Sequence, residues 1–453
     1  MTNHLSENQI TLIVIKALKE NKRAELEAIL DELQPYDLAK LYTLLPAKHR
    51  HKFLLSLQTN QLADLVEELE EDAQQLEVFN TLGIEKSGQI MDEMDNDDLA
   101  SLFEPLSQST IEGYLSGMKK EESEAVQQLL SYEHETAGRL MTNRFVWIPD
   151  HYTVRDTVEK LKDFAEYSET INYLYVIDQE KKLAGVVSYR DIILAELEDK
   201  ITDIMYERVI SVPVDMDQEE VAKIIERYDF LAIPVVDIDH VLKGIITIDD
   251  IIDVLIQEAN EDFEKLSATG KSIDFETKSL VAAYRRLPWL ILLLFIGIIS
   301  GGIISSFEET LQKVVALAFF MPMIAGMTGN TGTQSLAVVV RGLVSRDLDK
   351  QMVIKLILRE LGVGLIIGVT CSVLIAIIAY VWQGDFILGI VVGSSLFLTL
   401  VIGTLSGTII PLILYRLKID PAVASGPLIT TINDIFSLVT YFGIATIFIK
   451  YLM

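Results

Sequence analysis

Five long apolar segments in the C-terminal part of the chain constrain its fold more than any other feature. They cover roughly residues 287–306, 314–340, 354–382, 386–414 and 425–452. A helix needs about 20 mostly apolar residues to cross the hydrocarbon core of a bilayer. Basic residues recur in alternate connections, on the same side as Arg285 and Arg286, as the positive-inside rule requires. We therefore expect five membrane helices within residues 285–453, with the N-terminus in the cytoplasm and the C-terminus outside.

The second apolar segment contains an unusual stretch, MPMIAGMTGNTGTQ, from Met321 to Gln334. Its proline and glycines predict a broken membrane helix, and backbone groups freed by a break must face protein or a water-filled path. Asn330 and its polar neighbours supply neutral oxygens at that depth. A kinked packing helix with small residues is the alternative. A second polar interruption, Asn433-Asp434 in the last segment, favours an ion path.

Asp434 is the more informative of these two residues, because a carboxylate at the centre of a membrane helix costs about 3 kcal/mol. It has no basic neighbour in its own segment, and Thr430, Thr431 and Asn433 place oxygen atoms around it. Two copies across a dimer axis could hold a hydrated Mg²⁺ ion, which loses its water reluctantly. A proton-relay residue or a helix–helix hydrogen-bond anchor is the competing interpretation.

The remainder of the chain is strongly acidic. Residues 284–453 contain only 11 of the 38 Lys and Arg residues and 8 of the 66 Asp and Glu residues. The acidic excess in residues 1–283 repels nucleic acid and attracts cations, although solubility alone accounts for most of these carboxylates. The only cysteine is Cys371, so a bound metal would use oxygen ligands, which suit Mg²⁺. The sequence has neither a signal peptide pattern nor a nucleophile–base set or phosphate loop, and we do not expect an enzyme.

The acidic part contains two successive sequence patterns. Residues 1–135 show helical spacing of apolar residues, which predicts an all-helical domain. Residues 136–200 and 201–258 then repeat one pattern: LYVID and GVVSYRDI in the first unit, AIPVVD and GIITIDDI in the second. Each pattern predicts strand, turn, strand and then an acid at the start of a helix. Residues 259–284 predict an amphipathic connecting helix that leads to the membrane.

The two repeats resemble a tandem CBS pair, a module that commonly binds adenine nucleotides and forms dimers. The resemblance implies an ATP site that includes Tyr173, Arg190, Asp191 and Phe230. A helix N-cap for Asp191 and a core position for Phe230 are the alternatives.

The stretch PMIAGMTGNTGTQ matches PxxxGxxGNxGxQ, the pattern of the MgtE family of magnesium transporters, and the order of the parts matches as well. The resemblance implies an all-α superhelical N-terminal domain, an α/β tandem CBS pair, a connecting helix and an α-helical domain with five transmembrane helices. It implies a homodimeric Mg²⁺-selective channel of the cell membrane, with the pore between the second and fifth membrane helices. The pore residues that it implies are Asp434, Asn330, Gly326, Gly329 and Asn433.

The resemblance also implies that the cytoplasmic part senses Mg²⁺ and closes the channel. At low Mg²⁺ the carboxylates repel one another, and at high Mg²⁺ the ions bridge them, so that the compact state gains population. The candidate sensor residues are Asp95, Asp97, Asp98, Asp217, Glu219, Asp229, Asp250, Asp253, Glu258, Glu261, Asp262 and Asp420.

Two alternatives remain at this point. One is a less selective divalent cation channel that passes Co²⁺, Mn²⁺ or Ca²⁺. The other is a membrane-anchored CBS nucleotide sensor without transport. A CBS-bearing chloride channel is disfavoured, because five segments are too few and the basic residues of an anion filter are missing.

Overall fold

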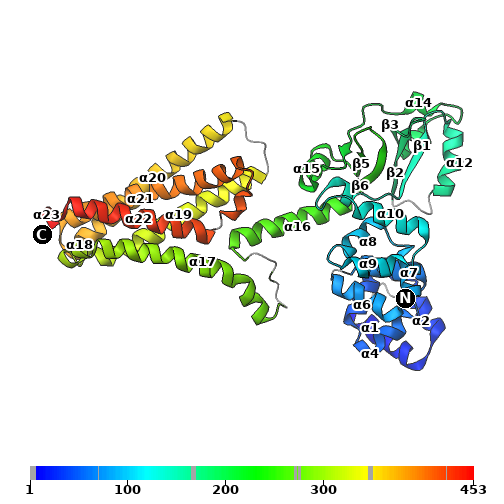
Figure 1. The fold of residues 1–453 in the computed structure, drawn as a ribbon, viewed down its shortest axis with the longest axis horizontal. Helices are drawn as coiled ribbons and strands as arrows, with labels where there is room; N and C mark the ends of the chain where they lie inside the picture. Colours follow the sequence, from blue (N-terminus) through cyan, green and yellow to red (C-terminus); the bar gives the residue numbers. More distant parts are fainter. Residues whose placement is uncertain are drawn as a thin grey trace. The chain divides into compact units, whose positions relative to one another are not determined.

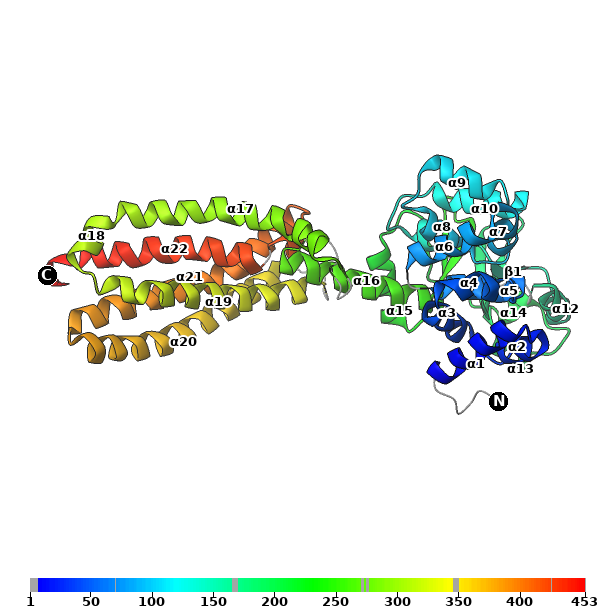
Figure 2. The same cartoon turned by 90° about the horizontal axis from the view of Figure 1, so that it is seen from below.

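The computed structural model describes residues 7–69, 71–164, 170–269, 273, 277–344, 350–424 and 426–452. The contacts divide the chain into two units, Met1–Leu255 and Ile256–Met453, whose elements are labelled in Figures 1 and 2. The first unit contains a helical N-terminal domain and two three-stranded sheets. The second unit is a helical bundle. This architecture confirms the predicted fold class.

Short amphipathic helices form the N-terminal domain around one apolar core that includes Tyr42, Phe53, Phe79 and Phe103. Proline and glycine residues mark the ends of some of these helices. Pro35 occupies the first position of its helix, where its missing N–H costs nothing. Gly83, with φ of 80°, turns the chain between two helices in a conformation that favours glycine. The helices are α1 (Glu7–Glu20), α2 (Arg23–Leu30), α3 (Pro35–Leu44), α4 (Ala47–Leu54), α5 (Thr59–Glu67), α6 (Asp72–Leu82), α7 (Ile84–Met91), α8 (Asn96–Phe103), α9 (Gln108–Leu115) and α10 (Lys120–Leu130).

The predicted repeat appears as two sheets of identical topology. In the first sheet, β1 (Phe145–Pro149) is parallel to β2 (Thr170–Ile177), which pairs antiparallel with β3 (Leu183–Ser188). The second sheet repeats this order with β4 (Val212–Pro213), β5 (Ala232–Val236) and β6 (Leu242–Thr247). The predicted strand pairs are β2–β3 and β5–β6, whereas the shorter first strand of each sheet was not predicted. The helices of this part are α11 (Ala137–Leu140), α12 (Val154–Phe164), α13 (Tyr189–Leu194), α14 (Ile201–Ile204), α15 (Gln218–Tyr228) and α16 (Ile248–Ser267).

The helix after each antiparallel strand pair starts in the same way. Ser188 donates a 2.6 Å hydrogen bond to Asp191 before α13, and Thr247 donates a 2.6 Å bond to Asp250 at the start of α16. The same carboxylates accept 3.3 Å bonds from the backbone N–H groups of Ser188 and Thr247, which satisfies a polar group just before each helix. Asp191 and Asp250 therefore occupy equivalent capping positions, as the repeated sequence pattern predicts.

Long helices form the second unit. α16 continues without a break to Ser267, and the next described helix begins at Ser279, so the expected connecting segment of residues 259–284 is not one separate helix. Lys271, within that segment, lies outside the described residues. The helices are α17 (Ser279–Ser306), α18 (Glu308–Lys313), α19 (Leu317–Val344), α20 (Lys350–Gln383), α21 (Phe386–Arg416), the 3₁₀ turn η1 (Pro421–Val423), α22 (Gly426–Ile447) and α23 (Ile449–Leu452).

The expected break in the second apolar segment is wrong. The helix α19 runs continuously through Met321–Gln334, and Pro322 lies inside it. Pro322 is only five residues from the start of the helix, where one missing N–H removes little of the hydrogen-bond ladder. Gly329 and Gly332 serve close packing instead. A Cβ atom on Gly332 would lie 2.0 Å from Nδ2 of Asn433, and one on Gly407 would lie 2.1 Å from the carbonyl oxygen of Gly332.

Among the described helices, α17, α20, α21 and α22 are long and apolar enough to cross a membrane. The helix α19 has 28 residues, which also suffices in length, but its polar and glycine-rich stretch lowers its hydropathy. It packs along α21 and α22, and Figure 2 shows it within the same bundle.

Candidate functional site

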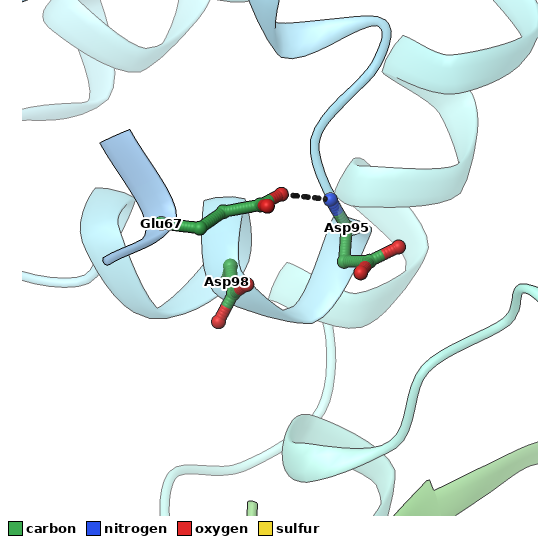
Figure 3. A group of neighbouring side chains, drawn as sticks. All are labelled: Glu67, Asp95 and Asp98. Atoms are coloured by element: carbon green, nitrogen blue, oxygen red, sulfur yellow. Dashed lines mark hydrogen bonds between the residues drawn. The ribbon is translucent and has the colours of Figure 1, made fainter. Parts of the chain in front are cut away.

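Three carboxylates of the N-terminal domain form the clearest candidate metal site. Glu67 ends α5, while Asp95 precedes α8 and Asp98 lies in its first turn. One oxygen from each of them lies within 4.8 Å of the others, and Figure 3 shows the two helices bringing them together. Glu67 Oε1 accepts a 2.8 Å hydrogen bond from the backbone N–H of Asp95. Oxygen ligands in such a group suit Mg²⁺.

Burial makes the negative charge of this group costly. It raises the pKa of Glu67 to about 7, an effect that the charge of Asp95 increases and the backbone hydrogen bond opposes. Burial likewise raises the pKa of Asp95, whereas Arg144 lowers it and the charge of Asp249 raises it further. A divalent cation would compensate these charges, because an opposite charge nearby favours the ionised form.

The sequence predicted part of this group. Asp95 and Asp98 were candidates and lie three positions apart, so both reach the same side of the helix start. Asp97 lies on another side of α8 and is buried. Glu67 was missed because it lies 28 residues from Asp95 in a run of acids that looks like a solvated surface. No local signal distinguishes it from its neighbours.

Arg144 ties the N-terminal domain to the first CBS unit beside this group. Its guanidinium donates 3.0 Å hydrogen bonds to the carbonyl oxygens of Asp92 and Glu93. The guanidinium nitrogens also lie 3.4 Å from a carboxylate oxygen of Glu122 and 3.6 Å from one of Asp95. Sequence reasoning did not identify this residue, which holds a positive charge between two domains.

The candidate sensor residues of the second CBS unit occupy different local positions. Asp217 caps α15 and accepts a 2.9 Å bond from the backbone of Glu219, and Glu219 pairs with Lys223 at 2.9 Å. Asp229 ends α15 in a left-handed conformation. Burial raises the pKa of Asp250 to about 6, against the effect of its hydrogen bond from Thr247.

The remaining sensor candidates lie on α16 and on the loop before α22. Asp253 is exposed, and Glu258 and Asp262 are half-buried. Glu261 and Asp420 lie on either side of Lys265, whose Nζ is 3.1 Å from Glu261 and 2.8 Å from Asp420. Burial alone would lower the pKa of Lys265, but hydrogen bonds to these two carboxylates raise it well above its ordinary value.

The candidate nucleotide residues lie on both CBS units. Tyr173 in β2 pairs across the sheet with Ser188, whose hydroxyl bonds to Asp191. Arg190 is exposed in the same first turn of α13. Phe230 is half-buried against the core of the second CBS unit, and its ring stacks on Tyr228 at 5.4 Å between centroids. The structure thus gives Asp191 a capping role and Phe230 a partial core role.

The candidate pore residues lie on α19 and α22, where some are exposed and others are buried in contacts between helices. Gly326 and Asn330 are exposed, one turn apart. Gly329 is buried, and a Cβ atom there would lie 2.8 Å from the Thr430 side chain. Asn433 is fully buried and accepts a hydrogen bond from Ser406. Gly329 and Asn433 therefore act in helix packing, while Asp434 is half-buried beside them.

One carboxylate in the bundle is neutralised within the structure. Glu360 on α20 is buried, and its two oxygens lie 2.8 Å from Arg359 and 3.1 Å from the Ser335 hydroxyl. Glu360 is thus paired with Arg359, its neighbour in the sequence. Pairing reduces the cost of a carboxylate among membrane helices.

Comparisons with known protein families identify each part of the chain. The model described as "Divalent cation transporter" matches residues 321–444, the "MgtE intracellular N domain" matches residues 33–135, and the CBS domain matches residues 137–198 and 201–257. Together they define a multi-pass membrane transporter with intracellular N-terminal domains, not an enzyme.

Full-length relatives give the family. The chain is 58% identical to a magnesium transporter MgtE of Bacillus subtilis, over 99% of both chains. It is 36% identical to the MgtE of Thermus thermophilus, over 98% of this chain and 99% of the relative. The chain belongs to the MgtE family of magnesium transporters.

Solved structures resemble its N-terminal part. The soluble part of a magnesium transporter, 39% identical, covers 56% of this chain and all of its own length with a TM-score of 0.54. The cytosolic domain of the Mg²⁺ channel MgtE in complex with ATP, 33% identical, covers 54% of this chain and 99% of its own length with a TM-score of 0.51.

Proposed function

We propose that this chain forms a homodimeric Mg²⁺ channel of the cell membrane, through which Mg²⁺ enters down its electrochemical gradient. The observation that carries the proposal is the polar face of α19. Gly326, Asn330 and Gln334 follow one another at helical spacing and are exposed in the protomer, whereas the opposite face packs on α21 and α22. Polar groups of a membrane helix face protein or a water-filled path and not lipid. A second copy of this face across a dimer axis would line such a path.

Asp434 supplies the charge of this path in our proposal. Two half-buried carboxylates related by the dimer axis would attract a dication that keeps its water shell, because Mg²⁺ dehydrates reluctantly. Asn330 would offer its amide to that shell. With α19 as the fifth crossing, the C-terminus lies outside.

We further propose that cytoplasmic Mg²⁺ closes the channel. Glu67, Asp95 and Asp98 supply several oxygens to one cation, and Asp249 of the second CBS unit adds negative charge near Asp95. A cation there would stabilise the contact between the N-terminal domain and the CBS unit, since it would offset mutual repulsion. The other acidic residues of the second CBS unit and α16 would act as further weak sites, apart from Glu261, which like Asp420 is paired with Lys265.

ATP is a second ligand in this proposal. A relative's cytosolic domain was crystallised with ATP; in this chain Arg190 and Asp191 lie in the first turn of α13, and Tyr173 of β2 pairs with Ser188 just before it. An aromatic ring and an arginine suit the base and phosphates of a nucleotide. Binding of ATP to the purified CBS pair, weakened by Arg190→Ala, would support this site.

Mg²⁺ flux into liposomes that contain the full-length protein tests the transport proposal. Wild type should pass Mg²⁺ when the cytoplasmic side lacks it, and the flux should fall as Mg²⁺ on that side rises. Asp434→Ala should abolish flux. Co²⁺ and Mn²⁺ as competitors would measure selectivity.

Glu308→Gln is the matched control, because it removes one carboxylate of the same unit from the short helix α18 and not from the polar face. It should leave flux unchanged. Equal flux in wild type and Asp434→Ala would refute the pore assignment, and no cation flux in wild type would support the nucleotide-sensor alternative.

A further inference from the structure

The end of α16 is joined to the loop before α22 by one lysine. Lys265 Nζ lies 3.1 Å from Oε2 of Glu261, one turn earlier in the same helix, and 2.8 Å from Oδ2 of Asp420. The other oxygen of Asp420 accepts a 2.8 Å bond from the backbone N–H of Ala422 and so fixes the turn η1. One ammonium group therefore bridges carboxylates from two separate segments.

An apolar contact accompanies this ionic bridge. Leu266 packs against an apolar cluster that includes Ala422, Ala424 and Ile429. Ile429 belongs to the first turns of α22, the helix that carries Asp434. A change in how the end of α16 sits on this loop would therefore act on the proposed pore helix directly.

The position of the ammonium group has an electrostatic consequence. Without it, Glu261 and Asp420 would place two negative charges close together, and like charges at short range repel. With it, the same oxygens are already paired with a cation. A Mg²⁺ ion and the Lys265 ammonium cannot both occupy the space between these oxygens, because the two cations repel each other.

We propose that Lys265 is a built-in substitute for Mg²⁺ that holds the end of α16 on the α21–α22 loop while cytoplasmic Mg²⁺ is low. The proposal rests on the proposed Mg²⁺ gating and adds one positioning residue to it. In wild type the contact survives without Mg²⁺. When the ammonium group is removed, the two carboxylates repel each other, and the contact requires a divalent cation.

Disulfide cross-linking measures the contact. The chain would carry Leu266→Cys and Ala424→Cys in a Cys371→Ala background, reconstituted at full length, and the cross-linked fraction would be measured with and without Mg²⁺. Wild-type Lys265 should cross-link equally in both conditions. Lys265→Met should cross-link about three- to tenfold less without Mg²⁺, as expected for two partly exposed ion pairs, and should recover when Mg²⁺ is added.

Matched variants separate charge from shape. Lys265→Arg should behave as wild type because it keeps the positive charge. Lys182→Met removes a lysine that is paired with Glu180 at 2.8 Å in the first CBS unit, and it should have no effect. In an Asp420→Asn background this repulsion is absent, so a chain that also carries Lys265→Met should cross-link without Mg²⁺.

Flux of the same variants without the added cysteines gives the functional readout. Lys265→Met should raise flux about three- to tenfold in the absence of cytoplasmic Mg²⁺. Equal cross-linking of Lys265→Met and wild type without Mg²⁺ would overturn the proposal, as would a Lys265→Arg variant that resembles Lys265→Met. If wild-type flux instead ignores Mg²⁺, the gating proposal fails, while the cross-linking result still decides the role of Lys265.

Discussion

Gly407→Ala should destabilise the helical bundle by preventing α19 and α21 from approaching each other. The Cβ atom of an alanine at position 407 would lie 2.1 Å from the carbonyl oxygen and 2.9 Å from the carbonyl carbon of Gly332. Both atoms belong to the backbone, so no side chain can rotate away. Ordinary contact needs about 3.5 Å, and the two helices would have to separate by about 1 Å or more.

The cost of this change can be estimated. Overpacking of a well-packed interior typically costs about 1–3 kcal/mol. For a domain of 150–250 residues, each kcal/mol lowers the melting temperature by about 2–4 °C. We therefore expect the purified protein in detergent to melt about 2–12 °C lower, as followed by intrinsic fluorescence or the loss of a monodisperse elution peak. Mg²⁺ flux should fall in parallel, because Asn433 and Asp434 lie on the helix that packs against the same part of α19.

The control is Gly362→Ala on α20, where an added Cβ would meet no atom within 4 Å. This variant should melt at the wild-type temperature or above it, since alanine is the better helix former. A Gly407→Ala variant as stable as Gly362→Ala would show that α19 and α21 do not pack this closely, and our explanation for the continuous helix α19 would be wrong.

Three further predictions concern the intracellular part. The folded-state pKa of Glu67, about 7, lies above its ordinary value, so the stability that this group contributes is complete below about pH 4.5 and is lost as the pH rises through 7. The Mg²⁺-free protein should therefore melt higher at pH 6 than at pH 8; Glu67→Gln should flatten this dependence and weaken stabilisation by Mg²⁺, and an unchanged pH profile would contradict the buried position. Arg144→Gln should destabilise the contact between the N-terminal domain and the first CBS unit by about 1–3 kcal/mol, because two backbone carbonyl oxygens lose a charged donor; faster hydrogen exchange in α8 would report it, and exchange at the wild-type rate would argue against the bridge. Ser188→Ala and Thr247→Ala each remove the hydroxyl that bonds to the carboxylate at the start of the following helix and should each cost about 0.5–2 kcal/mol, measured by urea unfolding; markedly unequal costs would show that the two repeats do not share one capping mechanism.

Much of the candidate site was predictable where its signal is local in the sequence. Asp95 and Asp98 share one helix start, so their spacing alone brings them together. The capping pairs Ser188–Asp191 and Thr247–Asp250 also follow from three-residue spacing within a repeat. Glu67, Arg144 and Asp249 were not predictable as partners of Asp95, because the contacts between them depend on how separate helices and the second CBS unit pack.

The sequence by itself determined the parts of this protein: apolar segments long enough for membrane helices, a duplicated strand–helix unit, an acidic intracellular region and the glycine-rich stretch of its family. These features are periodic or contiguous, and so the chain specifies them without reference to distant residues. Only the tertiary structure decided which carboxylates form a group, which of Gly326 and Gly329 is exposed, and that α19 is unbroken. Those outcomes depend on close fits between segments, such as Gly332 against Asn433 and Lys265 against Asp420, and a fit between surfaces exists only once both surfaces are folded.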